Sequence, residues 1–516
     1  MTQSRQIAKN ASVVALATLA SRILGFIRDA VVAATLGAGL PADAFFVAFR
    51  VPNVLRRLFA EGSMTMSFIP VFQRLRADQG EHAAFVMARS ALLWLLAVVG
   101  CITVLAEVFS GPLTALIAPG FAQNPGQLES AAALLRVCFP YIVLISAVGL
   151  CMGILNSLGH FLAPALSPVV LNICLIAAAL LGWHFGLDVA WCLAWGVLAG
   201  GLCQFLSQLP ALRAKGFSWR GERSWRNPGV ARMGKLMLPT VFGAAVYQIN
   251  TLLGTLLASF LAAGSISFLY YADRLVEFPL GVFGLAVSTA ALPNLSALAA
   301  TGKNEEFRET LSSTLRLTLF VSLPAMAGLM ALARPIVLLL FGRGRFDATA
   351  VDATAQAVMA FALGLPFAAL ARPLASAFYA RENTRTPVTV AFFCMLVNVG
   401  LGAALMQVLA HVGLALAVSA SSAVNFACLA LVMRRSAGRL LPLANLARMA
   451  GLSALVFAGA YATSGTAWLW LALIPFWAAL YVLAGRLLGM EEARLFLHML
   501  WGRMTRARGP ERGAKP

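Results

Sequence analysis

Between Asp43 and Glu61, arginines lie inside an apolar stretch where a membrane helix is otherwise expected. The guanidinium of arginine is a planar fork that pairs with two oxygens of a phosphate or carboxylate. With about 100° of rotation per helical residue, Arg57 lies about 20° from Arg50. Asp43 and Glu61 lie about 20° from Arg50 in the opposite direction around the helix axis. Arg56 lies about 120° from Arg50. The stretch therefore predicts a helix with one polar stripe that could bind an anion.

Two further predicted helices carry polar faces of the same kind. In the segment 10–36, Arg22 and Asp29 are seven residues apart and share one face, with Arg28 beside it. Charged residues within membranes usually face a bundle interior or a wet cavity. The segment 267–296 places four polar residues within an arc of about 100°. These are Tyr270, Asp273, Arg274 and Glu277.

Arginines outnumber acids in the predicted spans. The arginines are Arg22, Arg28, Arg50, Arg56, Arg57, Arg136, Arg274, Arg334 and Arg372, and the acids are Asp29, Glu61, Asp273 and Glu277. Left uncompensated, such a set costs on the order of 20–30 kcal/mol of insertion free energy. One alternative is an ordinary i,i+4 pair of Arg57 with Glu61, with the other charges reaching the membrane interface. Because Arg50 lies well inside its run, we favour a cationic cavity for a phosphate-bearing anion.

The composition places these helices in a membrane. Of 516 residues, 60% are hydrophobic and 11% charged, and the mean hydropathy is +0.83. A soluble domain carries about 25% charged residues. The net charge of +19 does not indicate nucleic acid, because no soluble basic domain of useful size is present. The chain is predicted to be an all-α polytopic membrane protein.

Apolar runs of spanning length predict about fourteen transmembrane helices. They are expected near 10–36, 43–69, 86–116, 132–156, 161–183, 186–210, 236–261, 267–296, 314–341, 355–380, 387–408, 411–433, 443–463 and 466–488. Most loop Lys and Arg residues then fall on one side, whereas the opposite loops hold only Arg343 and Arg345. By the positive-inside rule, both termini are expected in the cytoplasm. The short "GRGRF" at 342–346 is too isolated to indicate a nucleotide loop.

An internal repeat divides the predicted helices. Residues 44–75 overlay 267–298 without gaps, and 139–150 overlay 365–376 at a similar offset. Six helices in each copy give two lobes with the same membrane orientation, related by a pseudo-twofold axis along the membrane normal. The predicted divisions are an N-lobe at 1–211, a basic cytoplasmic linker at 212–235, a C-lobe at 236–435, two extra helices at 436–490 and a basic cytoplasmic tail at 491–516. Such lobes are typical of alternating-access transporters.

Three motifs resemble the MurJ/MviN family of bacterial lipid II flippases, in the MOP exporter superfamily. They are "SRILGFIRDAVVA" (21–33), "GAGLPADAFFVAFRVPNVLRRLFAEG" (37–62) and "YYADRLVEFPLGVFG" (270–284). The resemblance runs from about residue 10 to the end of the last predicted helix and weakens toward the C-terminus.

The resemblance implies a transporter rather than an enzyme, which moves an undecaprenyl-diphosphate-linked peptidoglycan precursor to the periplasmic leaflet. It implies a substrate site of Ser21, Arg22, Arg28, Asp29, Asp43, Arg50, Arg56, Arg57, Glu61, Asp273 and Arg274. It also implies a lipid-tail groove at the two extra helices. No cofactor is expected, and Na+ or the membrane potential is the expected driving force. Expected partners are the lipid substrate, membrane lipids and the peptidoglycan synthesis machinery, with a role in cell shape.

Other functions stay open at this point. The first is export of another polyprenyl-diphosphate-linked glycan, and the second is cation-coupled antiport of the MATE-like kind. The excess of arginine argues against cationic drugs as substrates. A membrane glycan polymerase needs paired carboxylates on the outer face, and the outer loops offer no clear pair. A non-transporting scaffold has no reason to keep a buried cationic stripe.

Overall fold

The computed structural model describes residues 3–59, 63–281, 285–438, 440, 443–466 and 469–498. Over these ranges the chain is helical and contains no strand, which confirms the predicted all-α class. The helices are α1 (Gln3–Leu36), α2 (Leu40–Phe59), α3 (Ser63–Val108), α4 (Ser110–Ile117), η1 (Pro119–Gln123), α5 (Gln127–Cys138), α6 (Tyr141–Ser157), α7 (Leu162–His184), α8 (Val189–Ala214), α9 (Pro228–Ser259), α10 (Ser265–Pro279), α11 (Leu285–Ala300), α12 (Asn304–Ala331), α13 (Ala333–Phe341), α14 (Ala348–Ala362), α15 (Leu365–Ala380), α16 (Arg385–Ala437), α17 (Leu443–Thr463) and α18 (Leu469–Leu487).

Many of these helices can cross a membrane. Within the described ranges, eight helical segments are long and apolar enough to span a bilayer, and one of them is α5 and α6 together (Gln127–Ser157). The pair α14 and α15, bent by 41°, makes a ninth when it is taken as one span. Two of the eight contain breaks, because α3 has non-helical backbone at Gly80 (φ 84°, ψ 176°) and α16 at Ala410 (φ 47°, ψ −130°). The predicted count of fourteen is consistent with this arrangement and stays a prediction.

Several predicted spans consist of two shorter helices. The span at 132–156 divides into α5 and α6 at Pro140, and the span at 314–341 divides into α12 and α13 at Leu332. In the span predicted at 43–69, residues 60–62 lie outside the described part of the chain, between α2 and α3. Pro140 lacks the N–H for an interior helical hydrogen bond and lies at the turn between α5 and α6, although α7, α8 and α12 continue through prolines of their own.

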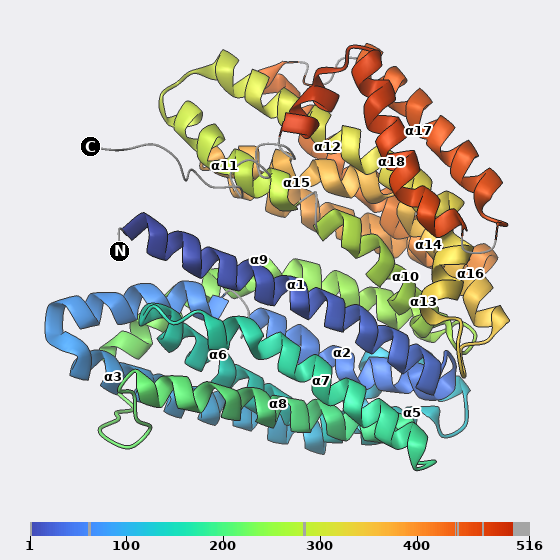
Figure 1. The fold of residues 1–516 in the computed structure, drawn as a ribbon. Coiled ribbons are helices and arrows are strands. Elements are labelled where there is room, and N and C mark those ends of the chain that lie inside the picture. The colour runs from blue at the N-terminus through green and yellow to red at the C-terminus, as the bar shows by residue number, and fades with distance from the viewer. Residues whose placement is uncertain are drawn as a thin grey trace, which may run out of the picture. The chain divides into compact units, whose positions relative to one another are not determined.

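The chain forms two compact units (Figure 1). Unit 1 comprises Met1–Phe268 together with Leu338–Val351, and unit 2 comprises Leu269–Val337 and Asp352–Pro516. In unit 1, α7 packs against both α1 and α8, and α3 packs against α6 and α9. Gly196 and Gly200 of α8 let that helix approach α7 closely, because an added Cβ would lie 2.6 Å from Ala178 Cβ or Leu171 Cδ1. The position of α1 is therefore set by α7.

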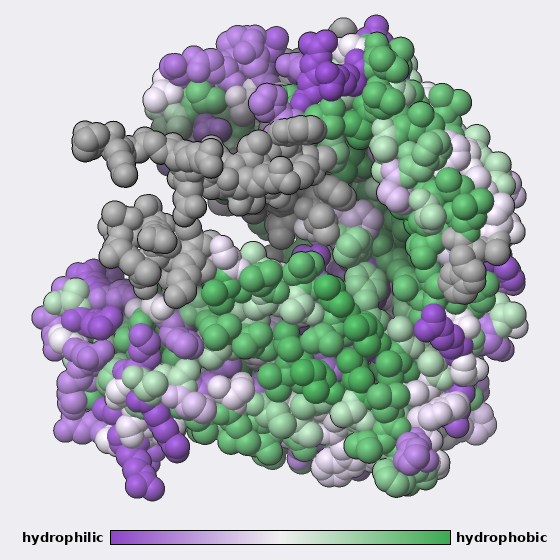
Figure 2. Space-filling model, in the orientation of Figure 1, coloured by the Kyte–Doolittle hydropathy of each residue, from purple (hydrophilic) through white to green (hydrophobic). Residues whose placement is uncertain are grey.

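The surface of unit 1 is apolar along its helices and polar at one end. Figure 2 shows hydrophobic residues spread over α7 and α8, and hydrophilic residues gathered where the loop between α8 and α9 lies. A lipid-facing surface is expected to be apolar in this way.

Unit 2 has its own core around α12. Phe320 of α12 lies 4.8 Å from the ring of Tyr481 in α18, and buried Leu452 and Val456 of α17 join the same cluster. Gly459 of α17 faces Trp477 of α18, where an added Cβ would lie 2.2 Å from the indole. The two extra predicted helices are thus packed on the lobe that precedes them. The lipid-tail groove and the predicted lobe boundaries stay predictions.

Candidate functional site

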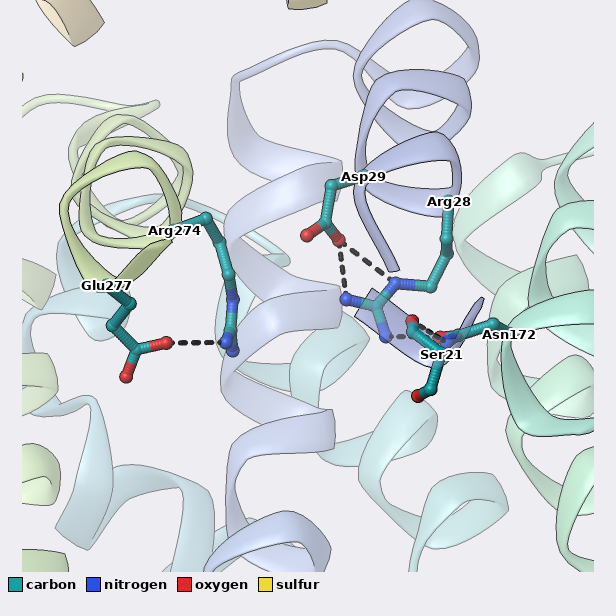
Figure 3. A network of polar contacts seen from close by, with 6 residues as sticks. All are labelled: Ser21, Arg28, Asp29, Asn172, Arg274 and Glu277. Atoms are coloured by element: carbon teal, nitrogen blue, oxygen red, sulfur yellow. Dashed lines mark hydrogen bonds and ion pairs between the residues drawn. The ribbon is translucent and has the colours of Figure 1, made fainter. Parts of the chain in front are cut away.

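The arginine–aspartate pair of α1 forms a defined polar contact (Figure 3). Arg28 donates from Nε and Nη2 to Oδ1 of Asp29, at 3.0 and 2.7 Å. Its Nη1 donates to Oδ1 of Asn172 in α7, at 3.0 Å. The Arg28 side chain is 17% exposed, and that of Asp29 is 5% exposed. Three hydrogen bonds therefore fix the plane of a partly buried guanidinium.

Asn172 also holds the backbone of α1. Its Nδ2 donates to the carbonyl oxygen of Ser21, at 3.2 Å, and the residue is buried. One amide thus bridges α7 to two turns of α1, at Ser21 and at Arg28. The sequence analysis did not include Asn172 in the site. Its only signal was in the internal repeat, where the offset that places 139–150 over 365–376 also places Asn172 over Asn398.

The arginines of α2 differ in their surroundings. Arg56, which lies off the predicted stripe, donates from Nε and Nη2 to Oδ1 of Asn53, at 3.0 and 2.9 Å. Arg50 and Arg57 are half-buried. Among the described residues, Arg57 has no hydrogen-bond or ion-pair partner, and the same holds for Arg22 of α1. Glu61, the expected partner of Arg57, lies outside the described residues.

In unit 2, α10 carries a second arginine–carboxylate pair. Arg274 Nη1 donates to Oε2 of Glu277 at 2.9 Å (Figure 3), and its guanidinium lies over the Tyr270 ring, 5.1 Å from the centroid. Asp273 is exposed. The sequence analysis named Asp273 and Arg274 as the site pair, although the acid bonded to Arg274 in the structure is Glu277. The i,i+3 spacing was the available signal.

Both carboxylate oxygens of Asp43 accept hydrogen bonds from other residues of the chain. It is 2% exposed, and its Oδ1 accepts from the backbone N–H and the hydroxyl of Ser267, at 2.8 and 2.5 Å. Its Oδ2 accepts from the N–H of Gly264, at 2.7 Å. A carboxylate at the first turn of a helix satisfies N–H groups that have no intrahelical partner. Asp43 of α2 therefore caps the start of α10, which its assignment to the substrate site did not anticipate.

Three of the other arginines in the predicted spans bond to local partners. Arg136 donates to the hydroxyl of Ser110 at 2.6 Å, and Arg372 donates to the carbonyl of Leu280 at 3.3 Å. Arg334 pairs with Asp352 at 2.7 Å. Asp352 was not among the acids counted in the sequence analysis. The cationic excess in the spans is therefore smaller than that count implied. It lies on α1 and α2, because α10 carries Asp273 and Glu277 against the single Arg274.

The arrangement can do one kind of chemistry, which is reversible binding of an anion. Arg28 and Arg274 each keep a bonded carboxylate beside a partly exposed guanidinium. An incoming phosphate can compete for the same N–H donors. Among the described residues, no three His, Cys, Asp or Glu side chains are grouped so that they could hold a metal ion. Coupling to Na+ or to the membrane potential stays a prediction, as does the meeting of the arginines of unit 1 and unit 2.

Fold and site together define a polytopic helical membrane protein whose interior helices carry arginine-rich polar faces. The family model for lipid II flippase MurJ matches residues 32–484. The chain belongs to this family. Lipid II is the substrate of the family, and its members are transporters rather than enzymes.

Relatives match most of the chain. A probable lipid II flippase MurJ of Vibrio cholerae serotype O1 is 40% identical over 441 residues, which cover 83% of each chain. A lipid II flippase MurJ of Burkholderia cenocepacia is 35% identical over 426 residues, which cover 81% of this chain and 82% of that protein.

Solved structures share the fold of this chain. A lipid II flippase MurJ in an inward closed conformation superposes with a TM-score of 0.77 at 26% identity, covering 95% of this chain and 99% of that one. An inward-facing multidrug resistance MATE family transporter of the MOP superfamily has a TM-score of 0.67 at 15% identity, covering 83% of this chain and 95% of that one. The second likeness concerns the fold alone.

Proposed function

We propose that this chain translocates lipid II, the undecaprenyl-diphosphate-linked peptidoglycan precursor, from the cytoplasmic to the periplasmic leaflet. Membership in the MurJ family supports the reaction. The observation that carries the binding step is the oriented guanidinium of Arg28, held by Asp29 and Asn172 in α1 and α7. Such a preset fork matches the paired oxygens of a diphosphate.

When no substrate is bound, the carboxylates beside the arginines stabilise the site. Without a ligand, neighbouring guanidinium groups repel one another, and the acids at Asp29 and Glu277 limit that repulsion. A diphosphate brings several negative charges and many acceptor oxygens, so it takes over the N–H donors as it leaves water. The same carboxylates then compete for the arginines and favour release. Binding by exchange of partners keeps the substrate from being trapped.

The translocation step follows from the repeated architecture. Two six-helix lobes, at 1–211 and 236–435, rock about the central site and open it to each leaflet in turn. We place the protein in the bacterial inner membrane with both termini in the cytoplasm, because loops rich in Lys and Arg are expected on the cytoplasmic side. The tail groove at 436–490 holds the polyprenyl chain, while Na+ or the membrane potential drives the cycle. The peptidoglycan synthesis machinery supplies and receives the lipid.

Depletion of the protein in its host tests this function. The expected result is accumulation of lipid II in the cytoplasmic leaflet, measured by extraction and by protection of its sugars from an impermeant reagent. Re-expression of the intact chain should reverse the accumulation. Accumulation of a different polyprenyl-diphosphate glycan would contradict lipid II as substrate. Unchanged lipid II together with loss of drug efflux would instead favour a MATE-like antiporter.

A further inference from the structure

The loop between α8 and α9 is folded onto α3 and presents a cluster of positive charge. Here the basic platform means residues 213–235. Its exposed cations are Arg213, Lys215, Arg220, Arg223, Arg226, Arg232 and Lys235. Glu222 is its only acid. The predicted linker is therefore a structured surface.

Arg89 of α3 organises this loop from beneath. It is 8% exposed, and its Nε donates to the carbonyl of Glu222 at 2.9 Å. Its Nη1 donates to the carbonyls of Ser218 and Arg220, at 3.2 and 3.4 Å. Gly221 (φ 132°) lies against the guanidinium, where an added Cβ would be 3.0 Å from Cζ. The loop therefore turns its carbonyls inward onto one buried cation.

Aromatic contacts fix the two ends of the loop. Phe217 is buried and packs edge-on against Phe85, with the ring centroids 5.2 Å apart. Trp94 of α3 donates from Nε1 to the carbonyl of Trp225 at 2.8 Å, and their rings meet edge-on at 5.2 Å. Both indoles stay substantially exposed, at 41% and 51%. Exposed tryptophans beside a membrane-spanning helix are typical of the headgroup region.

We propose that the basic platform is a binding surface for the headgroups of anionic phospholipids. The loop begins where α8, a candidate membrane span, ends at Ala214. Its cations therefore lie next to the bilayer surface, with Trp94 and Trp225 at the depth of the headgroups. A rigid, positively charged protein surface binds anionic lipid headgroups more strongly than it binds headgroups without net charge. This inference does not depend on which lipid is flipped.

Lipid-specific quenching of Trp225 tests the proposal. The full chain is reconstituted in vesicles of equal parts phosphatidylglycerol and phosphatidylcholine, with bromine carried by one lipid at a time. The signal of Trp225 is the difference between the unchanged chain and Trp225→Phe. We expect brominated phosphatidylglycerol to quench Trp225 more strongly than brominated phosphatidylcholine. Equal quenching by both lipids would overturn the proposal. An acidic protein partner would then be the alternative ligand of the basic platform.

Charge variants identify the residues responsible. In Arg220→Gln/Arg223→Gln/Arg226→Gln, the preference for phosphatidylglycerol should disappear, since each cation near an anionic surface contributes roughly fivefold to binding. The matched control is Lys303→Gln/Arg308→Gln, which removes exposed cations that are already paired with Glu306 and Glu305 at 2.8 and 3.0 Å. The control should keep the preference. A preference that survives the triple change contradicts the assignment.

The Arg89→Gln variant tests whether the folded conformation of the loop is needed, separately from the charge of its exposed cations. It leaves every exposed cation of the platform in place but withdraws the donors that hold three carbonyls. We expect faster tryptic cleavage after Arg220 and Arg223, together with loss of the lipid preference. A loop that is cleaved faster yet still prefers phosphatidylglycerol would contradict the role of Arg89. Lipid II transport in phosphatidylcholine vesicles provides an independent readout, and its failure would instead count against the proposed function.

Discussion

The carboxylate of Asp43 accepts both the backbone N–H and the hydroxyl of Ser267, at 2.8 and 2.5 Å. With the N–H of Gly264 as a third donor, a single side chain of α2 caps the start of α10. The segments 37–42 and 262–266 thereby lie close together. Asp43 thus has a structural role, helix capping, that a residue serving only to bind substrate would not have.

We predict that Asp43→Ala lowers stability as well as transport, because it leaves three buried donors without an acceptor. Each hydrogen bond to a charged group contributes about 1.5–3 kcal/mol, so the apparent Tm should fall clearly. Ser267→Ala removes only the hydroxyl donor and should lower the Tm less. Thermal unfolding in detergent checks both. A variant at Asp43 that lost transport with an unchanged Tm would point back to substrate binding.

The loop at 342–346, which is too isolated to indicate a nucleotide loop, instead contacts the end of α1. The N–H of Arg345 donates to the carbonyl of Ala34 at 2.8 Å, and its guanidinium lies over the Trp183 ring at 5.4 Å. A Cβ at Gly344 (φ 60°) would lie 2.2 Å from that carbonyl. We expect Gly344→Val to cost roughly 1–3 kcal/mol of stability.

Gly39→Ala is the matched control for this loop. An added Cβ there meets nothing within 4 Å, so its effect should stay within about 0.5 kcal/mol. Thermal unfolding of the two variants side by side makes the comparison. Equal melting temperatures would show that the loop at 342–346 does not hold α1.

Asn172 is predicted to position Arg28. Asn172→Leu should reduce lipid II transport about 100-fold, since a shift of about 1 Å in a positioned group can have that effect. Asn172→Asp keeps an acceptor for Arg28 and should recover part of the rate. Gln204→Leu is the control, because Gln204 is a buried amide that bonds to Ser167 of α7 rather than to Arg28. If both leucine variants slow transport equally, Asn172 has only a packing role.

The orientation of the chain can be measured with single cysteines. In a background without the eight native cysteines, residues introduced at Gln123 and Gly465 should react with an impermeant thiol reagent added outside. A cysteine at Ser224 should not, because the basic loops are predicted to face the cytoplasm. All three positions are exposed in the structure, so access depends on the side of the membrane. Labelling of Ser224 in intact cells would reverse the predicted topology.

Local spacing made the helical class and the polar faces predictable. Arg274 and Glu277 lie three residues apart, so their pair can be recognised in one helix. Arg28 and Asp29 are adjacent, and adjacent helical side chains do not normally face each other, so the spacing favoured Arg22 as the residue sharing a face with Asp29. The bond of Arg28 to Asn172 joins residues 144 positions apart, and no periodicity records such a contact. The break at Ala410 lies between the spans predicted at 387–408 and 411–433, so the apolar pattern located it, whereas the positive φ of an alanine there is not indicated by the residue type.

The arginines of α1, α2 and α10 give the sharpest prediction. Alanine at Arg28, Arg57 or Arg274 should abolish flipping while the protein still inserts and accumulates, because the diphosphate loses a fork that binds two of its oxygens. Lysine keeps the charge but not the fork, so it should rescue poorly at these positions and better at Arg50, where the field matters more. Transport of lipid II in reconstituted vesicles, normalised to the amount of inserted protein, measures each effect. Arg334→Ala serves as the control, since that arginine is exposed and pairs with Asp352. Normal transport by the alanine variants, or equal rescue by lysine at every position, would mean that the stripe is structural pairing. In that case Arg28 would serve Asp29 and Asn172 rather than the substrate, and the anion would have to bind elsewhere.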